Sequence, residues 1–157
     1  MYKNDGLVIN LPFLQGLRVL VVDNNVDCCD LIELLLQLYG VEVRKAFLAQ
    51  QALKIFVEWQ PDILVSDVAL PEVDGLTLVQ QARTISATRG KVLLGIAVTG
   101  YINEETRQLA LSGGFDFWFT KPLDLNDFVT VLVYSAIERF LFAITHRTSS
   151  NFVTIAI

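Results

Sequence analysis

Four short apolar segments of this chain each end in a residue that can do chemistry. Those residues are Asp23, Asp67, Thr99 and Lys121. The apolar segments are typical of strands in a parallel sheet, where the carboxyl ends of all strands gather at one edge. That edge would hold two carboxylates, a hydroxyl and an ammonium. This set favours a site for a metal ion and a phosphoryl group.

The composition indicates one globular domain and argues against binding of nucleic acid by this domain alone. The chain has 157 residues, of which 53% are hydrophobic and 18% charged. The charged share lies below the usual value of about 25%, which suggests that a partner covers part of the surface. The net charge is -5 and no basic stripe is present, which argues against nucleic-acid binding by this domain alone.

The sequence also favours a cytoplasmic protein that does not cross a membrane. No apolar run is expected to approach the roughly 18 residues of a membrane span, and residues 1–6 lack the pattern of a signal peptide. The two cysteines, Cys28 and Cys29, are adjacent. Adjacent cysteines rarely form a disulfide with each other, and no further ligands make a zinc site around them.

Strand-like and helix-like segments alternate through most of the chain. The predicted strands are 17–23, 41–45, 63–67, 92–99 and 115–120. The predicted helices are 27–39, 49–59, 76–85, 104–112 and a last one from Asp124 or Asn126 to about Phe142. Asn103 is the predicted N-cap of the fourth helix. Such alternation predicts a parallel sheet with helices on both faces.

A set of residues in register with these strands resembles a known family. Asp67 is followed by Pro71 and by Asp74-Gly75, and Lys121-Pro122 ends the last strand. In this order the residues resemble the receiver domain of bacterial two-component response regulators. The resemblance implies the flavodoxin-like (CheY-like) fold, a doubly wound five-stranded sheet of order 2-1-3-4-5. The domain is expected at 17–142, with an N-terminal extension at 1–16 and a C-terminal tail at 143–157.

The resemblance assigns a role to four residues of the site. It implies that Asp67 is the phosphoacceptor, and that Thr99 and Lys121 bind oxygens of the phosphoryl group. Trp118 matches the aromatic switch residue of the family. Since side chains alternate along a strand, Trp118 is expected on the opposite face from Phe117 and Phe119.

Mg²⁺ is the cofactor that the resemblance implies. The matching ligands are Asp23, Asn24, Asp67 and the main-chain carbonyl of Ala69. Asn24 departs from the family pattern, which has a second acidic residue at this position. An amide oxygen can bind Mg²⁺ but brings no charge, so the sequence predicts a weaker magnesium site.

The function expected from this resemblance is signalling and not enzymatic turnover. The phosphoryl group would come from a partner histidine kinase or phosphotransfer protein. Ala69 and Tyr101 match positions that tune hydrolysis in the family, and neither orients an attacking water well. At most slow self-dephosphorylation is therefore expected.

The last predicted helix carries more apolar residues than one buried stripe requires. Extra apolar area on a helix suggests an interface. The hypothesis is a homodimer formed through this helix and the fifth strand. The alternative is that tails of the same chain cover the helix.

Two other functions compete with a phosphorylated receiver. Asn24, Trp118 and the apolar last helix favour a degenerate receiver that acts as a phosphate-independent interaction or dimerisation module. A flavodoxin-like enzyme or FMN binder ranks last, because residues 24–27 lack the Ser-, Thr- or Gly-rich loop that cradles a phosphate.

Overall fold

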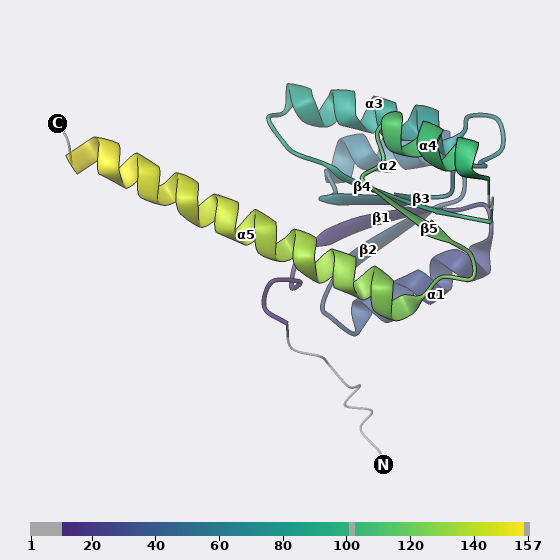
Figure 1. The fold of residues 1–157 in the computed structure, drawn as a ribbon, viewed down its shortest axis with the longest axis horizontal. Coiled ribbons are helices and arrows are strands. Elements are labelled where there is room, and N and C mark those ends of the chain that lie inside the picture. Colours follow the sequence, from purple (N-terminus) through teal and green to yellow (C-terminus); the bar gives the residue numbers. More distant parts are fainter. Residues whose placement is uncertain (1–10, 101–102, 156–157) are drawn as a thin grey trace, which may run out of the picture.

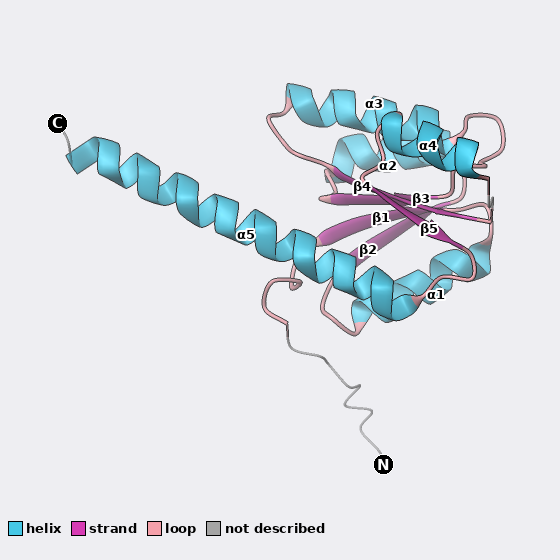
Figure 2. Ribbon diagram, viewed as in Figure 1, coloured by secondary structure: helices cyan, strands magenta, loops and turns pink. Residues whose placement is uncertain are grey.

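The computed structural model describes residues 11–100 and 103–155, with side chains described up to residue 145. Its centre is a five-stranded parallel sheet of order β2-β1-β3-β4-β5 (Figure 2), which confirms the predicted fold class. The strands are β1 (Arg18–Val22), β2 (Glu42–Ala46), β3 (Ile63–Ser66), β4 (Leu94–Thr99) and β5 (Phe117–Thr120). The helices are α1 (Val26–Gln37), α2 (Ala49–Trp59), α3 (Gly75–Thr88), α4 (Glu104–Ser112) and α5 (Leu125–Ile155).

Helices cover both faces of the sheet. Figure 1 shows α1 and α5 on one face and α2, α3 and α4 on the other. Each face has its own buried cluster, with Ile32 and Phe128 on the α1–α5 face and Phe56 and Leu78 on the α2–α3–α4 face. Because β1 and β3 are buried on both faces, their sequences are continuous apolar runs instead of alternating ones.

The register of the sheet brings the ends of β1 and β3 together. Val22 pairs with Ser66, the last residue of β3. The next residue, Asp67, continues the ladder by donating its main-chain N–H to the carbonyl of Val22 at 2.9 Å. Asp23 and Asp67 therefore leave the sheet side by side, as the strand pattern predicts.

Short polar side chains begin the helices that follow the strands. Asn25 caps α1 by accepting from the N–H groups of Asp27 and Cys28. Asn103 accepts from the N–H of Glu105, which confirms it as the cap of α4. Of the two residues predicted to begin the last helix, Asp124 is the cap. Each cap satisfies main-chain donors that the first turn leaves without a partner.

Residues 11–16, within the predicted N-terminal extension, pack against the domain. Leu14 is 1% exposed and belongs to the core on the α1–α5 face. Gly16 donates its N–H to the carbonyl of Gly40, and the ring of Phe13 meets that of Phe140 edge-to-face at 5.1 Å. This part of the extension therefore contributes to the core.

The last helix is longer than predicted. It runs to Ile155 and not to about Phe142, so the predicted end was wrong. Residues 143–155 contain no Gly or Pro that would end a helix. In the described part of the chain one segment, Leu125–Thr145 of α5, is long and apolar enough to cross a membrane. This is weak evidence for a membrane span, because core helices of soluble proteins can have the same length and apolar composition.

Candidate functional site

Two carboxylates and one ammonium meet at the carboxyl edge of the sheet. The Nζ of Lys121 lies 2.7 Å from Oδ2 of Asp23 and 3.1 Å from Oδ2 of Asp67. The side chains of Asp23 and Asp67 are 6% and 13% exposed, so both charges are largely removed from water. Lys121 stands between them and offsets their mutual repulsion.

Main-chain amides orient the remaining oxygen of each carboxylate. Oδ1 of Asp23 accepts from the N–H of Asn25 at 2.8 Å, and Oδ1 of Asp67 accepts from the N–H of Ala69 at 3.0 Å. Each carboxylate is therefore held at both oxygens, by an amide on one side and by Lys121 on the other. Such double anchoring fixes the direction of a side chain before any ligand binds.

Lys121 is placed by the end of β5 and by its neighbour β4. Its N–H donates to the carbonyl of Thr99 at 2.9 Å, and the following bond, Lys121–Pro122, is cis. Burial acts to lower the pKa of Lys121, but its hydrogen bonds to Asp23 and Asp67 outweigh that effect and raise it above 10.5. The ammonium is thus fully charged at neutral pH.

Thr99 ends β4 and is fully buried. Its Cα partner in the sheet is Thr120, the residue before the lysine. The register therefore puts Thr99 at the same edge as the three charged residues, where the sequence predicts it.

The oxygens at this edge suit a hard divalent cation. Asp23 and Asp67 contact the same ammonium nitrogen, so both can reach a single cation. Asn24 follows Asp23 directly and is exposed, so its amide oxygen is available to a ligand. Carboxylate, amide and main-chain carbonyl oxygens are the ligands that Mg²⁺ takes. The described residues contain no cluster of three or more His, Cys, Asp and Glu side chains that could hold a metal.

Trp118 lies apart from the charged residues, on the other face of β5 from Phe117 and Phe119. Trp118 packs against the α2–α3–α4 core, whereas the two phenylalanines pack on the α1–α5 side. This confirms the predicted alternation. The indole also lines a cleft of about 200 Å³ together with Asn103, Glu104, Arg107 and Thr120. There is thus open space between β5 and the start of α4 next to this side chain.

The structure adds two residues whose contribution to the site the sequence does not reveal. The hydroxyl of Ser66 donates to the main-chain carbonyl of Asp67 at 2.8 Å, and Gly75 packs against that same carbonyl. Gly75 stands out in the sequence as part of Asp74-Gly75, but its contact with Asp67 depends on the path of the loop between them. Tyr101 lies outside the described residues.

The geometry agrees with the comparison to known families. The family model described as the response regulator receiver domain matches residues 19–133. The chain belongs to the response regulator receiver family. It is 41% identical over 111 residues to the "uncharacterized 14.6 kDa protein in sodA1 3′ region" of Leptolyngbya boryana, covering 71% of this chain and 83% of that protein.

Two longer relatives match this chain over only part of their own length. The receiver is 29% identical over 110 residues to the DNA-binding dual master transcriptional regulator RpaA of Synechocystis, covering 70% of this chain and 45% of RpaA. It is 32% identical over 116 residues to the transcriptional regulatory protein TrcR of Mycobacterium tuberculosis, covering 74% of this chain and 44% of TrcR. The chain therefore spans less than half the length of these two regulators.

Solved receiver domains share the fold. A CheY-like receiver domain protein of Methanospirillum hungatei superimposes with a TM-score of 0.71 at 25% identity, covering 79% of this chain and 96% of the other. A receiver domain of Clostridium thermocellum gives a TM-score of 0.70 at 24% identity, covering 81% and 98% of the two chains. The second comparison bears on the fold alone.

Proposed function

We propose that this receiver accepts a phosphoryl group on Asp67 from a partner histidine kinase or phosphotransfer protein and signals by a conformational change in a phosphorelay. The observation that carries the proposal is the contact of Lys121 Nζ with both Asp23 and Asp67. A surface lysine without a role in the site would extend into solvent, whereas the ammonium of Lys121 contacts two largely buried carboxylates.

The transfer is a displacement at phosphorus. A carboxylate oxygen of Asp67 forms the new O–P bond while the P–N bond of the donor phosphohistidine breaks, and the imidazole nitrogen keeps the electron pair. The product is an acyl phosphate. Lys121 then pairs with an oxygen of the phosphoryl group, and the Thr99 hydroxyl donates to another.

Mg²⁺ is the cofactor of this proposal. Asp23, Asn24, Asp67 and the carbonyl of Ala69 would hold it, and the ion supplies positive charge that offsets repulsion between the incoming phosphoryl group and the carboxylates. Because Asn24 replaces an acidic residue of the family pattern, the site has one negative charge fewer. We therefore expect weaker Mg²⁺ binding than in a receiver with two acidic residues here.

The signal would pass through β4 and β5. When Thr99 moves toward the phosphoryl group, it frees space that Trp118 can enter, and the surface of α4, β5 and α5 changes. Phosphorylation then shifts an equilibrium between two conformations that exist beforehand. The proposal includes a cytoplasmic location, a homodimer through α5 and β5, no binding of nucleic acid or membrane by this domain, and a slow loss of phosphate without enzymatic turnover.

The test is intact-protein mass spectrometry after incubation with acetyl phosphate and Mg²⁺. The wild type should gain one phosphoryl group, and Asp67→Asn should gain none. Asp127→Asn is the matched control, because Asp127 is an exposed residue in the first turn of α5. An adduct on Asp67→Asn equal to that on the wild type would contradict the proposal.

The second candidate is a phosphate-independent interaction or dimerisation module. It is favoured by Asn24 and by the large exposed apolar residues of α5, among them Leu141 and Phe142 at 56% and 62% exposure. No adduct on a folded wild type at saturating Mg²⁺ would favour this candidate. Asn24→Asp is then the next variant, because it restores the charge that the family pattern has.

A further inference from the structure

Helix α5 has a second apolar face besides the one it buries. Its buried face contains Phe128, Leu132 and Ala136, all 5% exposed or less. A different set follows a spacing of four, three and four residues, namely Val133, Ile137, Phe140 and Ile144. This is the heptad spacing by which two helices pair along a narrow seam. We call these four residues, together with the flanking Leu141, the distal stripe.

The distal stripe becomes more exposed as α5 moves away from the sheet. Val133 and Ile137 are half-buried. Phe140, Leu141 and Ile144 are 49%, 56% and 43% exposed. Figure 1 shows this part of α5 continuing past the sheet and away from the other helices. The body of the domain therefore leaves the side chains in the outer half of the stripe about half exposed.

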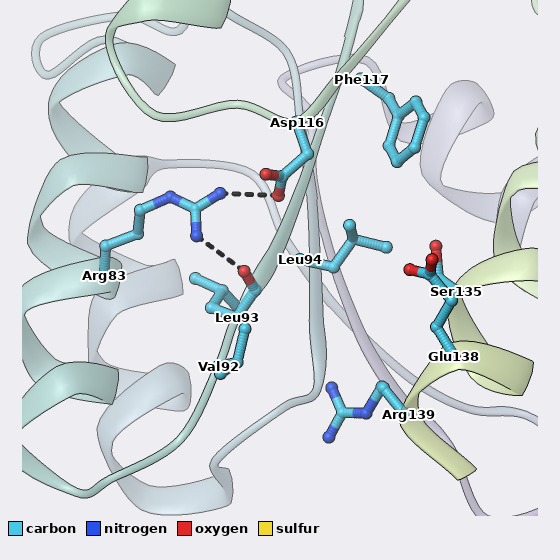
Figure 3. A pocket seen from close by; sticks show the side chains of 9 residues that line it. All are labelled: Arg83, Val92, Leu93, Leu94, Asp116, Phe117, Ser135, Glu138 and Arg139. Atoms are coloured by element: carbon cyan, nitrogen blue, oxygen red, sulfur yellow. Dashed lines mark hydrogen bonds and ion pairs between the residues drawn. The ribbon is translucent and has the colours of Figure 1, made fainter. Parts of the chain in front are cut away.

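The charged residues of this part of α5 lie off the stripe. Arg139 binds the carboxylate and the main-chain carbonyl of Asp62 at the start of β3. Ser135, Glu138 and Arg139 line a cavity of about 340 Å³ against Arg83 and the beginnings of β4 and β5 (Figure 3). Two copies could thus close along the stripe without burying a charge, and burial of an unpaired charge is the usual obstacle to a helix–helix contact.

The length of α5 also points to a partner. The helix has 31 residues, and its side chains belong to the buried core only as far as Ala136. Most of the stability of a helix in a protein comes from packing of an apolar face and not from intrinsic helix propensity. The outer part is rich in Thr, Ser, Phe and Ile, which are weak helix formers. Packing against a second helix would supply the stability that its sequence lacks.

The exposed apolar area is of the size that a dimer needs. Phe13, which packs on Phe140, is 41% exposed and widens the apolar surface beside the stripe. With about 200 Å² for each large side chain, Phe13, Phe140, Leu141 and Ile144 together expose roughly 400 Å² per chain. A standard interface buries about 800 Å² per partner, of which somewhat more than half is apolar.

We propose that a second copy of this chain packs on the distal stripe, α5 against α5, as a parallel two-stranded coiled coil. The occupant is a second copy because the seam from Val133 to Ile144, none of whose four residues is charged, is complementary to itself, as a two-fold symmetric interface requires. The inference rests on the homodimer of the proposed function, but not on phosphorylation of Asp67. It extends the contact of that homodimer to the outer half of α5, where the helix continues past the sheet.

Three exposed leucines on different helices allow a matched test of this contact. Leu141 on α5, Leu109 on α4 and Leu34 on α1 are 56%, 55% and 65% exposed. Sedimentation equilibrium of the full chain should show a wild-type dimer at micromolar concentration. Leu141→Glu should weaken the dimer at least tenfold, whereas Leu109→Glu and Leu34→Glu should leave it unchanged.

Other outcomes of this measurement overturn the inference. A wild-type monomer throughout the micromolar range removes the dimer altogether. Dissociation by Leu109→Glu alone would move the contact to the α4 side, and dissociation by Leu34→Glu alone would move it to α1. Binding of a monomeric wild type to phosphatidylcholine vesicles, lost in Leu141→Glu, would make a lipid surface the occupant.

A cross-linking experiment tests the pairing directly. In a parallel two-fold coiled coil, a residue at the seam meets its own copy. Ile144→Cys should therefore form a disulfide-linked dimer on mild oxidation, whereas Thr84→Cys, on the exposed side of α3, should not. The phosphoryl adduct is measured in parallel on Leu141→Glu. If Leu141→Glu is monomeric and still gains a phosphoryl group, then loss of the dimer does not prevent phosphorylation, and the two proposals are tested independently.

Discussion

Gly75, the first residue of α3, packs against the main-chain carbonyl of Asp67. A Cβ at this position would overlap the carbonyl oxygen and would lie 2.9 Å from the carbonyl carbon and 3.0 Å from Cα of Val68. All three neighbours are backbone atoms, which cannot rotate away as a flexible side chain could. The start of α3 thus sets the position of the main chain that carries Asp67, the proposed phosphoacceptor.

We expect Gly75→Ala to slow phosphorylation by acetyl phosphate at least tenfold in a protein that still folds. The methyl group would push the main chain at Asp67 aside, and an error of about 1 Å in a reacting group can cost about a hundredfold in rate. The rate is measured by mass spectrometry over time. Gly100→Ala is the matched control, because a Cβ there has no neighbour within 4 Å. Equal rates for both variants would show that the contact does not position Asp67.

Asn24→Asp should raise the affinity for Mg²⁺ about tenfold or more. The substitution adds a negative charge beside Asp23 at the point where a divalent cation is expected, and charged ligands bind Mg²⁺ more strongly than amides do. Isothermal titration with MgCl₂ measures the change. Asn126→Asp adds the same charge at an exposed position in the first turn of α5 and should leave the affinity unchanged. A similar gain in both variants would mean that overall charge, and not a ligand, is responsible.

The sheet and the grouping of the charged residues could be predicted from the sequence because a charged residue directly follows each of three apolar strands. Asp23, Asp67 and Lys121 each follow an apolar strand, and parallel strands gather such residues at one edge. The caps at Asn103 and Asp124 are also local signals. Strand limits shifted by one or two residues where the flanking residues are apolar as well, as at Phe115.

Features that depend on contacts distant in the sequence could not be predicted in the same way. The burial of Leu14 requires the space between α1 and α5, which no local pattern reveals. The contact between Gly75 and Asp67 depends on how the intervening loop closes. The end of α5 could not be predicted because the amphipathic pattern fades near Phe142 while the backbone stays helical to Ile155.

Lys121→Met should destabilise the domain at neutral pH in the absence of Mg²⁺, by about 1–3 kcal/mol, because two largely buried carboxylates lose their cation. The folded-state pKa of Lys121 is raised above 10.5. The stabilisation from its ion pairs is therefore fully present below pH 10.5 and is lost as the pH rises through the folded-state value. Urea unfolding of both proteins should show the difference at pH 8 and a smaller one at the highest pH at which they fold. A constant difference would contradict this assignment.

Cys29 should make the stability of the fold fall between pH 9 and about 11. This thiol is 0% exposed, and burial raises its pKa from 9.0 to about 11. In that range the unfolded chain loses the thiol proton while the folded chain keeps it, so unfolding becomes easier as the pH rises. The loss should be about 2 kcal/mol, since each unit of pKa corresponds to about 1.4 kcal/mol. Urea unfolding of the reduced protein at pH 8.5 and pH 10.5 measures it.

Two alanine variants separate Cys29 from the other groups that titrate in this range. Cys29→Ala removes the buried thiol, so its stability should fall less between the two pH values than that of the wild type. Cys28→Ala is the matched control, because Cys28 is only half-buried whereas Cys29 is buried. Its loss of stability should stay close to that of the wild type. Equal losses in all three proteins would mean that lysines and tyrosines, and not Cys29, set the decline at high pH.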